Sequence, residues 1–92
     1  MTFRKIKDPD AVLDYSIDWS AWLVDDTITT SSWSVTGADS DLTVDSDSKS
    51  TTATTVWLSG GTLGLTYTVT NRITTGDGRT DDRSIAVDVL EK

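Results

Sequence analysis

Aspartate is the most numerous side chain in this sequence that could carry chemistry, with fourteen Asp and one Glu among 92 residues. Paired carboxylates bind hard cations such as calcium, and at a suitable separation they hydrolyse glycosides. Residues 45–50 begin like a calcium-binding loop, but Lys49 stands at the fifth position and Ser50 where a sharp turn requires glycine. The other candidate ligands are Asp25 with Asp26, Asp39 with Asp41, and Asp81 with Asp82. Aspartates in turns commonly cap the local backbone, so we predict no metal site.

The sequence contains neither histidine nor cysteine. These absences exclude Ser-His-Asp and Cys-His catalysis, ordinary zinc sites and disulfides. Glycoside hydrolysis by two carboxylates needs a cleft, for which a domain of 92 residues leaves little volume. The glycine-rich residues 60–64 match neither common phosphate-binding pattern. We therefore expect no enzyme activity and no cofactor.

The formal net charge is −7 and the isoelectric point lies near 4.2. Affinity for nucleic acid depends on clustered Lys and Arg, so a nucleic-acid partner is disfavoured. No apolar run is long enough to span a bilayer, and the amino end lacks the apolar core of a signal peptide. We expect a soluble protein, made in the cytoplasm, without a membrane partner.

The elements that must position these side chains are strands. Seventeen Thr accompany four Trp and two Tyr, whereas the helix formers Glu and Gln number one and none. Apolar and polar residues alternate along successive short segments, with turn signals between them. The predicted strands are residues 13–19, 27–35 (with a bulge near 30–32), 42–44, 51–58 and 65–73. Residues 76–78 then lead, as the turn of a hairpin, into a last strand that contains the alternating residues 85–89. Residues 20–24 fit either one helical turn or an irregular crossing. Residues 37–41, 45–50 and 59–64 are predicted loops, the last with unusual backbone angles. This order predicts an all-β fold, an immunoglobulin-like β-sandwich of six or seven antiparallel strands.

The tryptophans are the main candidates for the core and for an interface. Trp19, Trp33 and Trp57 lie on predicted strands, where packing in the core is the expectation, and Tyr67 stands where such sandwiches place a corner tyrosine. Trp22 has two interpretations that the sequence leaves open. It caps the open end of the sandwich, or it is an exposed anchor at a protein interface.

The amino-terminal segment differs in charge from the rest of the chain. Its first seven residues hold three basic residues and no acid, leaving five basic and fifteen acidic residues elsewhere. We therefore divide the chain into a basic arm, residues 1–10, and a single sandwich domain, residues 11–92. The arm is either a solvated flexible terminus or a segment that docks on an acidic neighbouring subunit. The candidate partner-binding residues are Phe3, Arg4, Lys5, Ile6, Lys7 and Trp22.

Three arginines gather around the last predicted hairpin, namely Arg72, Arg79 and Arg83. They could pair with Asp81 and Asp82 nearby or with carboxylates of a partner. Local pairing is the interpretation we favour.

The sequence resembles those of the fiber-tail adaptors, small structural proteins of tailed bacteriophages. The resemblance rests on residues 7–15, 18–23, 56–62, 67–75 and 78–85. It implies a β-sandwich protein of the virion tail, present in several copies, that joins tail and fiber subunits. Two alternatives remain: an immunoglobulin-like module that displays Trp22 or Trp57 to carbohydrate on a host surface, and a decoration protein of a capsid.

Overall fold

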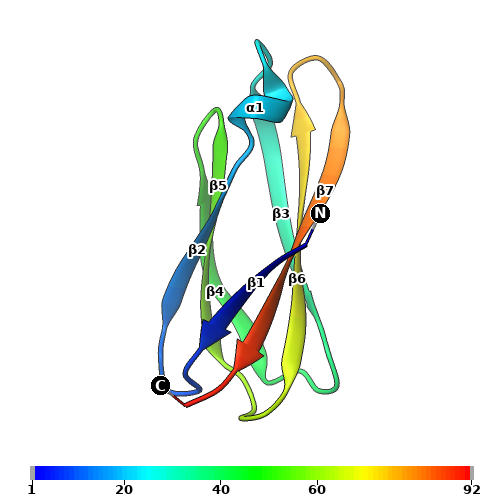
Figure 1. Cartoon of the computed structure of the whole chain (residues 1–92). Coiled ribbons are helices and arrows are strands. Elements are labelled where there is room, and N and C mark those ends of the chain that lie inside the picture. Colours follow the sequence, from blue (N-terminus) through cyan, green and yellow to red (C-terminus); the bar gives the residue numbers. More distant parts are fainter. Residues whose placement is uncertain (1, 92) are drawn as a thin grey trace.

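Seven strands and one short helix make up the part of the chain that the structure describes, residues 2–91, with side chains described from residue 4 onward. The structure is a computed structural model (Figure 1). Its elements are β1 (Thr2–Lys7), β2 (Leu13–Asp18), α1 (Ser20–Leu23), β3 (Ile28–Thr36), β4 (Leu42–Lys49), β5 (Ala53–Gly60), β6 (Thr66–Thr75) and β7 (Thr80–Val89). No helix in this described part has the length and apolar character to cross a lipid bilayer.

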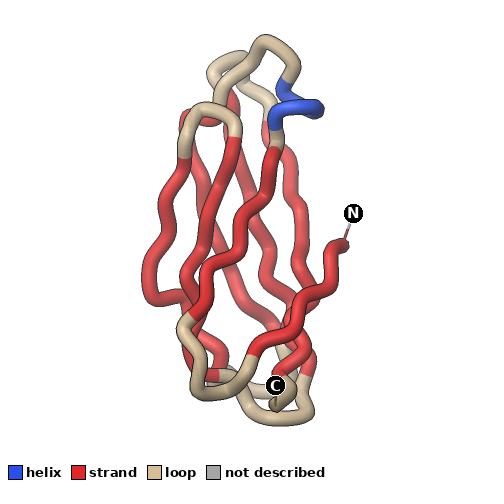
Figure 2. The backbone as a smooth tube through the Cα atoms, turned by 60° about the vertical axis from the view of Figure 1, so that its left-hand side comes forward, coloured by secondary structure: helices blue, strands red, loops and turns tan. Residues whose placement is uncertain are grey.

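The strands form two sheets that face each other, as Figure 2 shows. One has the order β1-β7-β6-β3 and the other the order β2-β5-β4. The neighbours β2-β5-β4 and β7-β6-β3 match the strand order of immunoglobulin domains, so the predicted all-β fold is confirmed. The strand pairs are antiparallel except one, because β1 runs parallel to β7.

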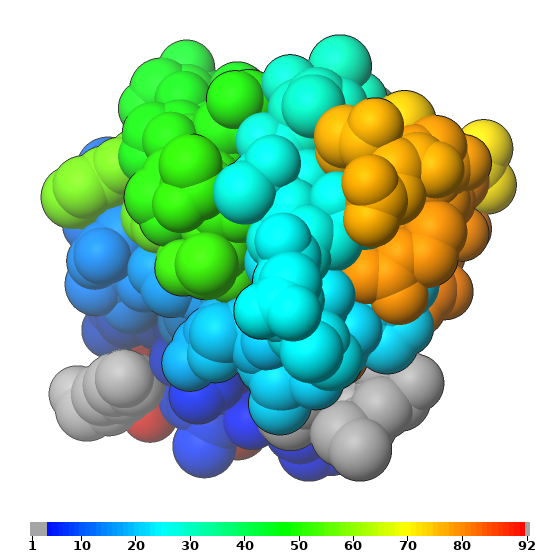
Figure 3. Space-filling view, turned by 90° about the horizontal axis from the view of Figure 1, so that it is seen from above, coloured from blue at the N-terminus to red at the C-terminus, as the bar shows by residue number. Residues whose placement is uncertain are grey.

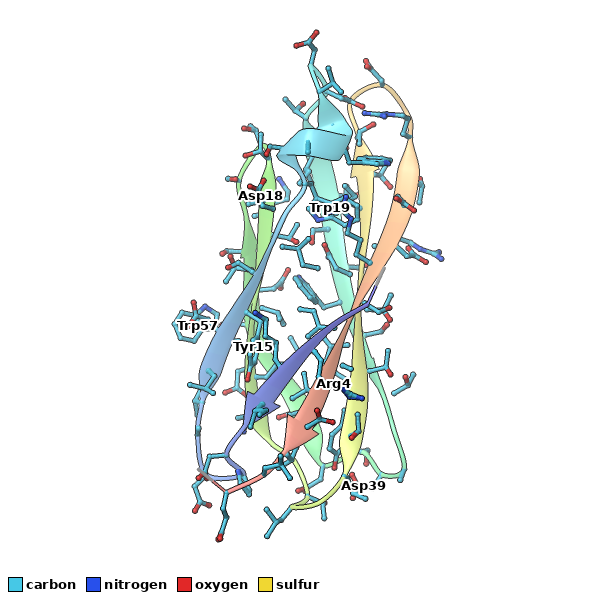
Figure 4. All side chains as sticks on the ribbon, viewed as in Figure 1. Arg4, Tyr15, Asp18, Trp19, Asp39 and Trp57 are labelled. Atoms are coloured by element: carbon cyan, nitrogen blue, oxygen red, sulfur yellow. The ribbon has the colours of Figure 1, made fainter. Side chains whose placement is uncertain are left out.

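The core lies between the two sheets and follows the alternation of the sequence. Along β6, for example, Tyr67, Val69 and Ile73 are fully buried, and along β5 Val56 and Leu58 are. Trp19, just after β2, fills the core near α1, as the labelled side chain in Figure 4 shows. Each such burial stabilises the fold by about 1.5–3 kcal/mol before the entropy cost of ordering is counted.

Several turn predictions are confirmed. Residues 76–79 connect β6 to β7 as a hairpin, and Gly60, Gly61 and Gly64 have positive φ angles, which residues with a Cβ rarely adopt. β3 has an irregularity, as expected, but its register shift lies between Ile28 and Thr30, just before the predicted residues 30–32. Of the two interpretations of residues 20–24, the structure shows the helical turn, α1.

The prediction of a loop at residues 45–50 is wrong. Most of this segment belongs to β4, which pairs with β5 along its length and has a register shift between Val44 and Ser46. In β4 only Leu42 is buried, because β4 is the edge strand of its sheet. Its Asp and Ser residues therefore carry no apolar pattern from which a strand could be recognised.

Of the tryptophans expected in the core, Trp57 lies on the surface and Trp33 only borders the core. Trp57 is 41% exposed because its side chain points to the outer face of the sheet (Figure 4). Trp33 is half-buried and packs against the edge of the core, with an indole N–H that has no partner among the described residues. The core tryptophan is Trp19.

The amino-terminal segment differs from the expected arm. Thr2–Lys7 pair in register with residues 84–89 of β7, which makes them a strand of the sandwich and not a flexible terminus. The backbone hydrogen bonds that β1 forms with β7 hold the segment in place. Residues 8–12 then carry the chain across to the other sheet, where β2 begins.

Candidate interaction surfaces

The basic residues of β1 point in two directions. Lys5 and Lys7 face the interior edge of the sandwich, whereas Arg4 and Ile6 face outward. The Arg4 guanidinium forms an ion pair of 3.3 Å with Asp88, and Ile6 is about half exposed. The side chain of Phe3, another candidate, lies outside the described residues. The structure therefore does not gather the predicted β1 residues into one patch.

Lys7 is fully buried, which is unusual for lysine. Its Nζ donates hydrogen bonds to the carbonyl oxygens of Gly60 at 2.7 Å and Asp8 at 2.9 Å. Burial lowers the pKa of Lys7, and the negative charges of Asp8, Asp10 and Asp45 oppose that shift. Lys7 thus ties the end of β1 to the end of β5 and is not available to a partner from this position.

The α1 end of the sandwich combines two tryptophans with two arginines. The rings of Trp19 and Trp22 meet edge to face, with their centroids 5.5 Å apart. The guanidinium of Arg79 lies 4.2 Å from the centre of the Trp22 ring, and that of Arg83 lies 4.3 Å from the Trp19 ring. Figure 3 views this end, where the segment after α1 lies between the β4–β5 and β6–β7 turns. Trp22, half-buried and covered by Arg79, caps the end of the sandwich.

Asp26 anchors Arg79 at this end. The Arg79 Nε is 3.1 Å from the Asp26 carboxylate, and the Arg79 Nη2 donates to the Leu23 carbonyl. Hydrogen bonds hold the pKa of Asp26 below its ordinary value, the largest contribution coming from the Thr75 hydroxyl and smaller ones from the N–H groups of Thr27 and Asp77 and from Arg79. Because this carboxylate already accepts several hydrogen bonds, it holds α1 and the β6–β7 turn together at this end of the sandwich.

The opposite end holds the predicted corner tyrosine. Tyr67 is buried, and its hydroxyl accepts a hydrogen bond of 2.9 Å from the N–H of Thr62, five residues upstream. The same hydroxyl donates to Asp39, whose pKa is lowered first by Tyr67 and then by Thr62 and the N–H of Asp41. The expectation for Tyr67 is confirmed, and Asp39 serves to fix a loop.

A cavity of about 270 Å³ opens at the edge of the sandwich between β2 and the strands β1 and β7. Its lining consists of Lys5, Ser16, Ile17, Asp18, Arg83 and Ile85. Arg83 is committed there to the Trp19 ring and to the Asp18 carbonyl. The other two predicted arginines are also committed: Arg72 forms a bidentate pair with Asp82, as expected of local pairing, and Arg79 pairs with Asp26.

The outer face of the β2-β5-β4 sheet presents a single large aromatic side chain, Trp57. Asp14 lies directly opposite it on β2 and Ser46 on β4. The surrounding residues are small and hydroxylated: Ser16 and Thr55 hydrogen-bond across the strands at 2.8 Å. The alternation of Trp57 with the apolar Val56 and Leu58 is the signal that places Trp57 on the outer face.

The aspartate pairs make local hydrogen bonds: Asp39 and Asp41, for example, both accept from the Thr62 hydroxyl. Among residues 2–91, no group of three or more Asp or Glu side chains is placed to hold a metal ion. Asp25 is exposed while Asp26 is bonded to Arg79, and Asp82 is bonded to Arg72.

In a comparison with known families, a family model matches residues 7–88 of the chain. The matching family model is described as podophage GP4 fiber-tail adaptor protein gp77. No curated protein matches the chain.

Proposed function

The chain belongs to the podophage GP4 fiber-tail adaptor family, and on that premise we propose that it is a non-enzymatic structural subunit that joins tail and fiber proteins in a virion. The match to the family model over residues 7–88 carries this proposal, since it spans nearly the whole sandwich.

The polar clusters of the molecule support a structural role. At the α1 end Asp26 is bonded to Arg79, and at the other end Asp39 is bonded to Tyr67 and Thr62. Groups bonded in this way hold loops in place and are not poised for proton transfer to a substrate. The sequence also lacks histidine and cysteine, the side chains most used as base and nucleophile.

The expected partners are tail and fiber subunits, and the expected location is the virion tail, after synthesis in the host cytoplasm. The shape of the chain suits this role, because its extents of 40 × 19 × 19 Å give long sheet faces relative to its mass. Several copies would then lie around the tail, each holding neighbours through a sheet face or edge.

Assembly tests the proposal. Particles made from a phage genome lacking this gene are expected to have tails without fibers, and supplying the chain in trans is expected to restore them. Antibodies against the chain should label the tail of purified virions in electron micrographs. Fibers retained in the absence of the chain, or virions that contain none of it, would contradict the adaptor role.

A further inference from the structure

Trp57 and Asp14 provide two of the three groups that are found together at the α1 end, where an arginine lies between a tryptophan ring and an aspartate. At the α1 end, Trp22 is covered by Arg79, whose guanidinium is also paired with the Asp26 carboxylate at 3.1 Å. On the outer face of the β2-β5-β4 sheet, Trp57 and Asp14 supply the ring and the carboxylate. Side chains directly opposite on antiparallel strands have Cβ atoms about 4.5–5.5 Å apart. One guanidinium can therefore reach both groups.

The chain itself supplies no arginine to this place. Each of its four arginines is already engaged: Arg4 with Asp88, Arg72 with Asp82, Arg79 with Asp26, and Arg83 with the Trp19 ring. Asp14 takes no part in the ion pairs of the described residues.

The charge of this face favours a basic occupant. Besides Asp14, it carries Asp45, which accepts a hydrogen bond of 2.6 Å from Ser59. Within the described strands β2, β4 and β5 the one basic residue is Lys49, which lies opposite the inward-facing Thr54. A cation that approaches Trp57 therefore meets carboxylates and no outward-facing basic residue of these three strands.

We propose that the outer face of the β2-β5-β4 sheet, centred on Trp57 and Asp14, docks another protein through an arginine that stacks on Trp57 and pairs with Asp14. Arginine suits the place better than lysine, because its planar guanidinium stacks on a ring while its edge binds a carboxylate. Tryptophan and arginine are also enriched among the residues that contribute most to binding at protein interfaces. Each arginine of the chain is already paired or stacked within it, so a second copy would have to give up one of these contacts to occupy the site. We therefore assign the site to a different protein, and a second copy is the alternative that the assembly test separates. The inference rests on the proposed function, for which it names the face that holds the partner.

The first test measures the chemistry of the face directly. The full chain labelled with 5-fluorotryptophan gives separate fluorine signals, and Trp57→Phe identifies the signal of Trp57. The peptide Gly-Arg-Gly-Arg-Gly is expected to shift this signal at a concentration roughly three- to fivefold lower than Gly-Lys-Gly-Lys-Gly does. Asp14→Asn is expected to remove most of the preference. Equal effects of the two peptides, no shift of Trp57, or a larger shift with a neutral oligosaccharide would overturn the proposal.

The second test uses assembly and separates this inference from the adaptor role. Trp57→Ala and Asp14→Arg are expected to lower the amount of chain in purified particles by roughly tenfold or more, as loss of an interface anchor does. Leu63→Ala is the matched control, since Leu63 is also an exposed apolar residue, 53% exposed, but lies in the β5–β6 loop. If the wild-type chain enters particles and both variants enter equally, the docking face is wrong while the adaptor role stands. If the wild-type chain itself is absent from particles, the adaptor role fails. A wild-type chain that dimerises in solution through Trp57, with the dimer lost in Trp57→Ala, would also overturn the choice of a different protein.

Discussion

The guanidinium of Arg79 lies over the ring of Trp22, 4.2 Å from its centre, while its Nε donates a hydrogen bond to Asp26. A residue from the last hairpin thus covers a residue of α1. This contact closes one end of the sandwich, and it shows Trp22 in the first of the two roles that the sequence allowed, that of a cap.

Replacement of Arg79 tests how much this closure contributes. Arg79→Gln removes the cation over Trp22, and we expect the free energy of unfolding to fall by about 1 kcal/mol, with tryptophan emission shifted to the red. Urea denaturation followed by fluorescence measures both. Arg72→Gln, which removes an arginine from an exposed pair, is expected to change stability less, because exposed ion pairs contribute little.

The Asn71 side chain links the two sheets and should be costly to replace. Its Oδ1 accepts hydrogen bonds from Thr54 at 2.7 Å and Trp19 at 3.2 Å, and its Nδ2 donates to Ser31 and to the Ser32 carbonyl. Asn71→Leu leaves several buried polar groups without a partner, so we expect a loss of about 2–4 kcal/mol in chemical denaturation. A loss below about 1 kcal/mol would show that the network is not a significant source of stability.

The two tryptophans Trp19 and Trp33 provide a matched pair of substitutions. Trp19 Nε1 donates to Thr54 and Asn71 within the core, whereas Trp33 Nε1 has no partner among the described residues. Replacing each with Phe should therefore cost more at Trp19, by about 1–3 kcal/mol, than at Trp33. Thermal unfolding of the two variants measures the two losses of stability. A larger loss for Trp33→Phe than for Trp19→Phe would contradict the prediction.

Stability should fall in acid because of Asp26. Its pKa is lowered in the folded state, so its contribution is complete above the ordinary value of 3.8 and is lost as the pH falls through the lower folded value. The Thr75 hydroxyl is the largest cause, so Thr75→Val should raise the pKa of Asp26 and move this loss to higher pH. Carboxyl carbon chemical shifts of Asp26 across the acid range measure the change. An unchanged titration in Thr75→Val would assign the shift to the other donors.

Lys7 should act in the opposite range of pH. Its pKa is lowered from 10.5 by burial, so the folded chain releases this proton before the unfolded chain does, and stability rises as the pH approaches 10.5. Lys7→Met should abolish this rise. The raised pKa of Tyr15, caused first by burial, acts in the opposite sense, so the difference between the wild type and Lys7→Met isolates the lysine. Parallel slopes in the two proteins would contradict the assignment.

Alternation along the chain by itself determined most of the fold. The order Tyr67, Val69, Asn71 and Ile73 specified the inward face of β6, and all four residues are buried. The glycines with positive φ specified the turn after β5. These features are local, because the period of a strand and the sterics of a turn depend on neighbours in sequence.

Contacts between distant segments decided the rest. Polar β4 is a strand only because β5 offers it a hydrogen-bonding edge, and β1 lies in the sandwich because β7 does the same. Alternation places Trp57 on the face of β5 opposite to Val56 and Leu58. Whether that face is covered depends on how the sheets are arranged. In the two-sheet arrangement it is the outer face, so Trp57 lies at the surface. Backbone pairing and burial are properties of two chain segments together, and the composition of either segment alone does not contain them.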